Sequence, residues 1–448
     1  MPESLEDFEK RAAEWLARNG EPIGDPADAP DGDRTGPAGT PEDGDLNTAN
    51  SRPGKFSADG NSRPGKFSVA VFHDLDHAEE REVLADAQRW QQLKATEGFH
   101  AITEPPSHGG LGLPKEYAQA FASLESGFGV PSGHESFSVT TDLIAPTIGV
   151  FGTAEQKERF VASFLSASEL CCQLFSEPGA GSDLAGLACR AVRDGDEWVI
   201  DGQKVWSSGA QFCEWGLLIA RHDVDAVKHK GLTAFIVPMD AEGVEIRPIR
   251  QMSGGSSFNE VFFSGCRVPD TLRLGDVGDG WRVSLTTLGF ERDHSDPAGE
   301  AGSDRPGGRW PQLLDTARRM GVTDDLLVRQ DLMSVYVHKR VEAMLNQRAA
   351  DLARGGTPGP EGSLGKLMWT EGLTLMAEVA SRILGPRICA EGGEWGTWEW
   401  REHLLGAPGY RIAGGSDEIQ RNIIGERVLG LPGEPRVDKD VAWKDVPR

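Results

Sequence analysis

The chain has 448 residues, of which 70 are acidic and 46 are basic, and its formal net charge is -24. This length predicts two to four domains and excludes a single small module. Nucleic-acid phosphates bind to a basic stripe, which this acidic sequence lacks, so we expect no nucleic-acid partner. No stretch of about 18 apolar residues occurs, which predicts a cytoplasmic protein with no membrane partner.

The cysteines form no CxxC pair and have no His/Cys spacing typical of metal ligands. They lie at positions 171, 172, 189, 213, 266 and 389. The adjacent Cys171 and Cys172 have poor geometry for a disulfide. We therefore expect buried thiols in a reducing compartment, and no metal site.

Residues 3–19 have the apolar spacing of an amphipathic helix. Residues 20–68 are rich in Gly, Pro, Asp and Asn, and the octapeptide NSRPGKFS occurs twice, at 50–57 and 61–68. Such a duplication predicts a loop that tolerates insertion. The alternative is that its basic side chains bind a partner or a CoA phosphate.

Four helical runs follow at 77–98, 114–128, 138–152 and 154–167, so residues 1–168 are predicted to form an N-terminal helical domain. Short β-rich runs separated by turn residues then occupy 169–275, which predicts a small sandwich or barrel. Helical spacing returns in 276–436, and residues 437–448 form a tail. The predicted order is helices, strands, helices.

Three motifs occur along this framework: FSEPGAGSDLAG at 175–186, DGQKVWSSG at 201–209 and GGSDEIQRNIIGERVLGLP at 414–432. In this order and spacing they resemble the acyl-CoA dehydrogenase family over about residues 69–435. The resemblance implies an N-terminal helical domain, a middle β-barrel and a C-terminal four-helix bundle. It also implies FAD as cofactor and α,β-dehydrogenation of an acyl-CoA, or of another carrier-bound acyl thioester.

The first motif suggests an anion site, because Gly179 and Gly181 can adopt positive φ and turn consecutive N–H groups toward phosphate. An ordinary Gly-rich turn is the alternative. By resemblance, Phe175 and Ser176 lie against the flavin ring. Ser182 lies between the FAD pyrophosphate and the CoA substrate.

The other two motifs also match cofactor positions. Trp206 and Ser208 correspond to family residues at the flavin, although a strand tryptophan is more often a core residue. Ser416 is a candidate N-cap, and the first turn of its helix contains Glu418. The resemblance directs this helix end toward FAD.

In the family, FAD lies across a dimer interface, and a second subunit contributes an Arg and a Gln. The matching residues here are Arg319 and Gln330, while Arg382 and Gly385 match positions near the adenosine. Pro386 has no N–H to donate there. For Arg319 and Gln330, the alternative is a solvated helix charge or amide. The resemblance thus implies a homodimer or homotetramer, with a hetero-oligomer as another option.

The usual catalytic base is missing, since Ala413–Ser416 replaces the family's Tyr-Glu-Gly-Thr. Isovaleryl- and long-chain-type members have the base on an earlier helix, immediately before an Arg, and Glu291 with Arg292 fits that pattern. Glu291 would remove the α-proton, and the Gly414 N–H would bind the thioester oxygen. The alternative for Glu291 is a solvated Glu near a helix end, and Arg292 would steer CoA or anchor the loop. The Pro/Gly/Asp-rich segment 293–308 is either a lid or a linker.

The resemblance implies an electron-transfer flavoprotein as the partner that accepts electrons from the reduced flavin. Two alternatives stay open, because a fold does not fix a reaction. One is an oxygen-using oxidase or hydroxylase. The other is a non-catalytic partner subunit of a hetero-oligomer.

Overall fold

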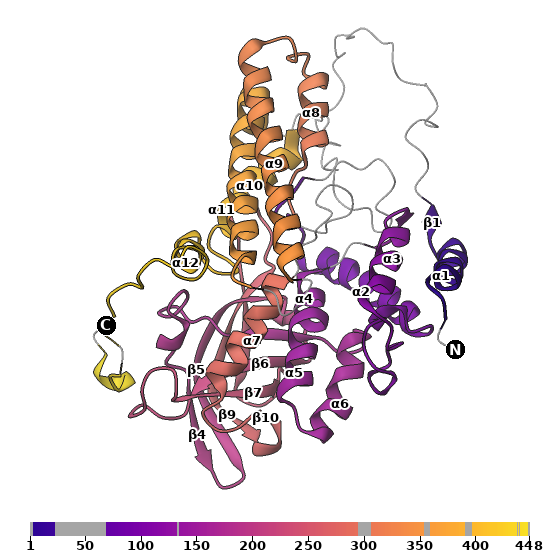
Figure 1. Ribbon diagram of the computed structural model, residues 1–448. Helices are drawn as coiled ribbons and strands as arrows, with labels where there is room; N and C mark the ends of the chain where they lie inside the picture. Colours follow the sequence, from indigo (N-terminus) through magenta and orange to yellow (C-terminus); the bar gives the residue numbers. More distant parts are fainter. Residues whose placement is uncertain are drawn as a thin grey trace, which may run out of the picture.

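A computed structural model describes residues 3–22, 69–131, 134–293, 306–353, 359–389, 397–436, 438 and 440–446 (Figure 1). The side chains of 291–293, 353 and 397–398 are not among the described parts. The repeated octapeptide and most of the 293–308 segment also lie outside the described residues, so the two loop predictions stay predictions.

The N-terminal part is helical, as predicted. Its helices are α1 (Leu5–Asn19), α2 (His77–Ala95), α3 (Lys115–Glu125), α4 (Glu135–Ser138), a π-helix (Val139–Ile144), α5 (Ala145–Phe151) and α6 (Ala154–Leu165). The predicted apolar face of α1 is buried against α3. The short strand β1 (Glu21–Pro22) lies at the start of the segment predicted as loop, and it pairs with β2 (Phe128–Gly129).

The middle part is an eight-stranded sheet. Its strands are β3 (Cys171–Leu174), β4 (Arg190–Asp194), β5 (Glu197–Ser208), β6 (Trp215–Arg221), β7 (Leu232–Pro238), β8 (Val244–Ile249), β9 (Phe258–Pro269) and β10 (Arg273–Leu274). The order is β10-β7-β6-β4-β5-β9-β8, with β3 beside β6, and the end strands do not pair with each other in the described residues. One face packs on the π-helix and α5–α7.

The C-terminal part returns to helices. They are α7 (Gly280–Asp293), α8 (Trp310–Arg319), α9 (Leu326–Ala353), α10 (Gly362–Leu384), α11 (Thr397–Tyr410) and α12 (Asp417–Ile423), which continues into a π-helical turn (Ile424–Val428). α8 to α11 form an upright bundle above the sheet (Figure 1). The predicted order of helices, sheet and helices is confirmed.

Two further expectations concern the cysteines and membrane-spanning helices. Five cysteines are buried and unpaired, as expected, but Cys389 is exposed because it ends a short helical turn after α10. Burial raises the pKa of Cys189 to about 11, which keeps this thiol protonated. None of the described helices has the length and apolar content required to cross a membrane.

Candidate functional site

Two of the three sequence motifs meet where the sheet joins the bundle. The Ser182 hydroxyl donates to the Ser416 hydroxyl at 3.5 Å, although the two residues are 234 positions apart. Ser416 is the N-cap of α12, as predicted, and its side chain accepts the Ile419 N–H. The exposed Ser182 follows β3 in the glycine-rich loop. The contact therefore joins the first motif to the third.

A buried ion pair supports this loop. The Lys204 ammonium is fully buried in β5 and lies 2.7 Å from the Glu177 carboxylate and 3.0 Å from Phe175 O. Glu177 also accepts the N–H groups of Ala188 and Cys189 at 2.7 and 2.8 Å. Sequence reasoning missed this pair, although a lysine between buried positions of a strand was a usable signal.

The glycines of the loop do not behave as predicted. Neither Gly179 nor Gly181 has positive φ, so the predicted nest of N–H groups built on them is wrong. The reason is local: Glu177 and Ala180 exchange both backbone hydrogen bonds at 3.0 Å, which closes the turn without a left-handed residue. Phe175 is buried, and Ser176 O accepts the Val205 N–H at 2.9 Å.

Trp206 lies in a strained bulge of β5. Its φ is 64°, the β5–β9 register shifts between Lys204 and Ser207, and its side chain is 59% exposed. The core alternative for Trp206 is therefore wrong. A left-handed conformation costs a non-glycine residue about 1–3 kcal/mol and is found mainly at functional sites. Asn259 holds the bulge by donating to Ser207 O at 3.0 Å.

Ser208 follows the bulge and contacts the N-terminal helices. Burial raises the pKa of the Glu135 carboxyl in α4, while the Ser208 hydroxyl acts on that pKa in the opposite direction. Next to it, Gly209 has φ 57°, and a Cβ there would overlap the Ser136 hydroxyl. The segment that carries Trp206 and Ser208 is therefore tightly positioned.

A row of aromatic rings runs from Trp206 toward the bundle. The ring centres of Trp206 and Phe258 are 6.1 Å apart, and those of Phe258 and Phe72 are 5.3 Å apart. Phe72 stacks on Tyr410 with 5.0 Å between the ring centres. Tyr410 in turn lies 4.7 Å from Trp369 of α10. These rings connect the sheet to the segment that precedes Gly414.

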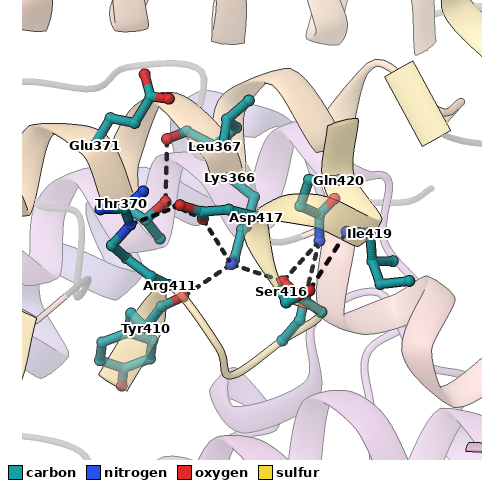
Figure 2. A network of polar contacts seen from close by, with 12 residues as sticks. Lys366, Leu367, Thr370, Glu371, Tyr410, Arg411, Ser416, Asp417, Ile419 and Gln420 are labelled. Atoms are coloured by element: carbon teal, nitrogen blue, oxygen red, sulfur yellow. Dashed lines mark hydrogen bonds and ion pairs between the residues drawn. The ribbon is translucent and has the colours of Figure 1, made fainter. Parts of the chain in front are cut away.

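A polar network fixes that segment (Figure 2). Asp417 is 2% exposed and accepts from Arg411 Nε at 2.7 Å and Thr370 Oγ1 at 3.0 Å. Lys366 Nζ lies 3.9 Å from Asp417 and donates to Tyr410 O at 2.8 Å and to a second carbonyl, that of the residue before Ser416, at 2.7 Å. Sequence reasoning missed this network, since its partners are far apart in the chain.

The network leaves donors and acceptors for a ligand. Gly414 and Gly415 have φ of 63° and 85°, and Gln420 Nε2 donates to Gly414 O at 3.0 Å. Within the described part of the chain, no acceptor receives the Gly414 N–H, and the buried Gln420 Oε1 has no partner. These groups and the hydroxyls of Ser182 and Ser416 fit a polar ligand such as a flavin nucleotide or a thioester.

The other predicted cofactor residues lie elsewhere. Arg319 is the last residue of α8 in the bundle, and its Nε lies 3.1 Å from an Asp315 carboxylate oxygen. Arg382 pairs at 2.7 Å with the Asp that follows Gln330 in α9. Gly385 ends α10 with φ 55°. In the described part of the chain, no hydrogen bond or ion pair joins these residues to Ser182.

Three predicted residues lie near the ends of α7 and α12. Glu418 is exposed in the first turn of α12. Glu291 and Arg292 have their backbone in the last turn of α7, and their side chains are outside the described residues. The structure therefore leaves the predicted roles of Glu291 and Arg292 as predictions.

Comparisons with known proteins give the family. Sequence models of the acyl-CoA dehydrogenase N-terminal, middle and C-terminal domains match residues 69–168, 172–266 and 278–429. The acyl-CoA dehydrogenase IpdE1 of Mycobacterium tuberculosis is 38% identical over 359 residues, which are 80% of this chain and 91% of that protein. The chain belongs to the acyl-CoA dehydrogenase family. It is therefore an oxidoreductase, and its family implies a flavin cofactor.

Solved structures agree with this assignment. The structure named "Tcur3481-Tcur3483 steroid ACAD" has a TM-score of 0.67 and 28% identity, and the match covers 78% of this chain and 89% of that one. The ChsE4-ChsE5 complex from Mycobacterium tuberculosis has a TM-score of 0.64 and 28% identity, with 80% and 93% covered.

Proposed function

We propose that this acyl-CoA dehydrogenase binds FAD and converts an acyl-CoA into the 2-enoyl thioester. The observation that carries the proposal is the Ser182–Ser416 contact. It brings the flavin- and CoA-binding motif of the family beside the Gly414 N–H, which has no acceptor in the described residues. A backbone donor is what the thioester carbonyl oxygen requires as negative charge develops on it.

Each residue then has a role in the reaction. Glu291 removes the α-proton of the thioester, and the Gly414 N–H donates to the carbonyl oxygen as negative charge develops. FAD, when bound, would supply the acceptor for the hydride that leaves the β-carbon. Phe175, Ser176, Trp206 and Ser208 bind and orient its ring, and Gly181, Ser182, Ser416 and Glu418 line the neighbouring phosphate and substrate region. Arg292 steers CoA.

A second subunit completes the proposed cofactor site. Arg319, Gln330, Arg382 and Gly385 lie on the bundle helices α8 to α10, and no contact among the described residues joins them to Ser182, so they would serve FAD bound to a partner. α9 supports association, because it exposes large apolar side chains along its length. They are Leu326, Leu327, Met333, Tyr336, Val337, Val341, Met344 and Leu352. We propose a dimer or dimer of dimers, with an electron-transfer flavoprotein as electron acceptor.

A hetero-oligomeric subunit is the second candidate. Its support is the 28% identical ChsE4-ChsE5 complex, together with the glycine at 414 in place of the usual Glu. The other 28% identical structure is named as a steroid ACAD, which favours a bulky, polycyclic acyl group. A glycine at 414 leaves room for such a group.

Anaerobic titration of the FAD-loaded protein with a panel of acyl-CoAs tests the proposal. The flavin absorbance should bleach, and Glu291→Gln should slow that reduction by a factor on the order of 10² or more while substrate still binds. Glu378→Gln, an exposed carboxylate of α10, is the matched control. Reduction at the original rate in Glu291→Gln contradicts the base assignment. No bleaching unless a partner chain is added favours the hetero-oligomer.

A further inference from the structure

The terminal segment, Asp438 and residues 440–446, returns from α12 to the sheet. Its backbone runs beside the turn between β6 and β7, where Trp443 donates its N–H to Ala226 O at 2.9 Å. A bridge between Ala442 and Val227 continues the pairing. The segment is therefore docked by main-chain hydrogen bonds, which fix its register.

The Trp443 side chain reaches the back of the glycine-rich loop. Its Nε1 donates to Gly186 O at 3.1 Å, and the Arg221 guanidinium lies 4.4 Å from its ring centre. Arg221 is 1% exposed and donates to Ala185 O at 2.6 Å and Leu187 O at 3.0 Å. The Trp443 indole and the Arg221 guanidinium thus donate together to the three consecutive carbonyls of residues 185–187. The indole also shields the buried guanidinium from water.

A second contact joins the segment to the residue after Ser182. The Lys228 ammonium is nearly buried and lies 2.7 Å from Asp183 and 2.9 Å from Asp438. Burial disfavours its charge, but hydrogen bonds to the two carboxylates outweigh burial and raise the pKa of Lys228. The ammonium therefore stays charged and ties the terminal segment to the loop.

We infer that Trp443 and Asp438 are positioning residues for the FAD- and CoA-binding loop, a role that rests on the function proposed above. The Glu177–Lys204 pair holds the part of the loop before Ser182, and the terminal segment holds the part after it. Ser182 lies between these two anchors. A loop held at both sides loses little entropy when it binds its ligand.

Hydrogen exchange of the full-length protein, together with ligand affinity, tests the inference. Trp443→Ala should speed exchange of the 183–189 amides about tenfold, and it should raise the Kd for FAD or the KM for acyl-CoA by a similar factor with kcat little changed. Trp443→Phe keeps a ring over Arg221 but loses the N–H, so its effects should be smaller. Asp438→Asn removes only the second contact and should show part of the effect. Lys444→Ala, which breaks the exposed pair with Asp225, is the control.

The outcomes separate the two proposals. Wild-type exchange at 183–189 and wild-type Kd and KM in Trp443→Ala overturn the inference, and so does a lowered Tm without any local change in exchange. If the wild-type protein binds no FAD, the proposed function fails, while exchange in the protein as purified still decides whether Trp443 positions the loop. If Trp443→Ala does not fold, the Phe and Asn variants give the same comparison.

Discussion

Replacing Asp417 should uncouple the Gly414 segment from the bundle. In Asp417→Asn the carboxylate charge is lost, so Arg411 and Lys366 no longer have this counter-ion. A buried hydrogen bond to a charged group contributes about 1.5–3 kcal/mol. Breaking a fully buried ion pair costs about 3–5 kcal/mol, but Arg411 is 41% exposed, which reduces that value.

We therefore expect Asp417→Asn to destabilise the protein by about 2–3 kcal/mol, because asparagine can still accept one of the two short hydrogen bonds. For a helical domain of this size, that loss corresponds to a decrease in Tm of roughly 5–10 °C. Flavin reduction should slow as well, since Lys366 holds the carbonyl groups on either side of Gly414. Thermal scans and anaerobic stopped-flow measure the two effects.

The matched control is Glu378→Gln, which removes the same charge from an exposed site on α10. It should leave both Tm and the reduction rate unchanged. If Asp417→Asn has a Tm within about 1 °C of the wild type and reduces its flavin at the wild-type rate, the network in Figure 2 does not position the Gly414 segment.

Two further perturbations test the surrounding structure. Burial lowers the pKa of His403 below its ordinary 6.5, so at acidic pH the unfolded chain binds a proton that the folded chain does not. The stability that His403 contributes is therefore full above about pH 6.5 and is lost as the pH falls. The Tm difference between wild type and His403→Gln should shrink between about pH 7.5 and pH 5. Gly209→Ala should destabilise by about 2–4 kcal/mol, because φ is 57° and the new Cβ overlaps Ser136, and Ser136→Gly should restore part of the lost Tm in the double variant.

The sequence predicted the fold well where periodicity was strong. β5 lies inside the segment predicted to be β-rich, and α9 and α10 lie inside the segment predicted to be helical. The bounds of α11 could not be obtained from spacing, because Gly406, Pro408 and Gly409 interrupt its pattern. The bounds of β4 could not be obtained either, because only one of its five side chains is buried.

The candidate site was predictable only in its motifs. Ser182 and Ser416 were identified from glycine-rich runs, and the structure brings them together. Lys204 gave a usable signal, but its partner Glu177 could not be obtained from spacing because it lies on a separate segment. The left-handed Trp206 could not be obtained either. Backbone strain at Trp206 is a property of the folded sheet and leaves no local signature in composition.

The backbone at Gly414 explains why this position suits glycine and gives a test of the relocated base. Its φ of 63° is left-handed, so a Glu there costs about 1–2 kcal/mol while its N–H and carbonyl keep their places. In the Glu291→Gln background, Gly414→Glu should therefore fold with a Tm a few degrees lower and recover part of the flavin reduction rate. Gly414→Gln in the same background adds the same strain without a carboxylate and should recover none. Equal rates in these two double variants would mean that residue 414 does not face the α-carbon.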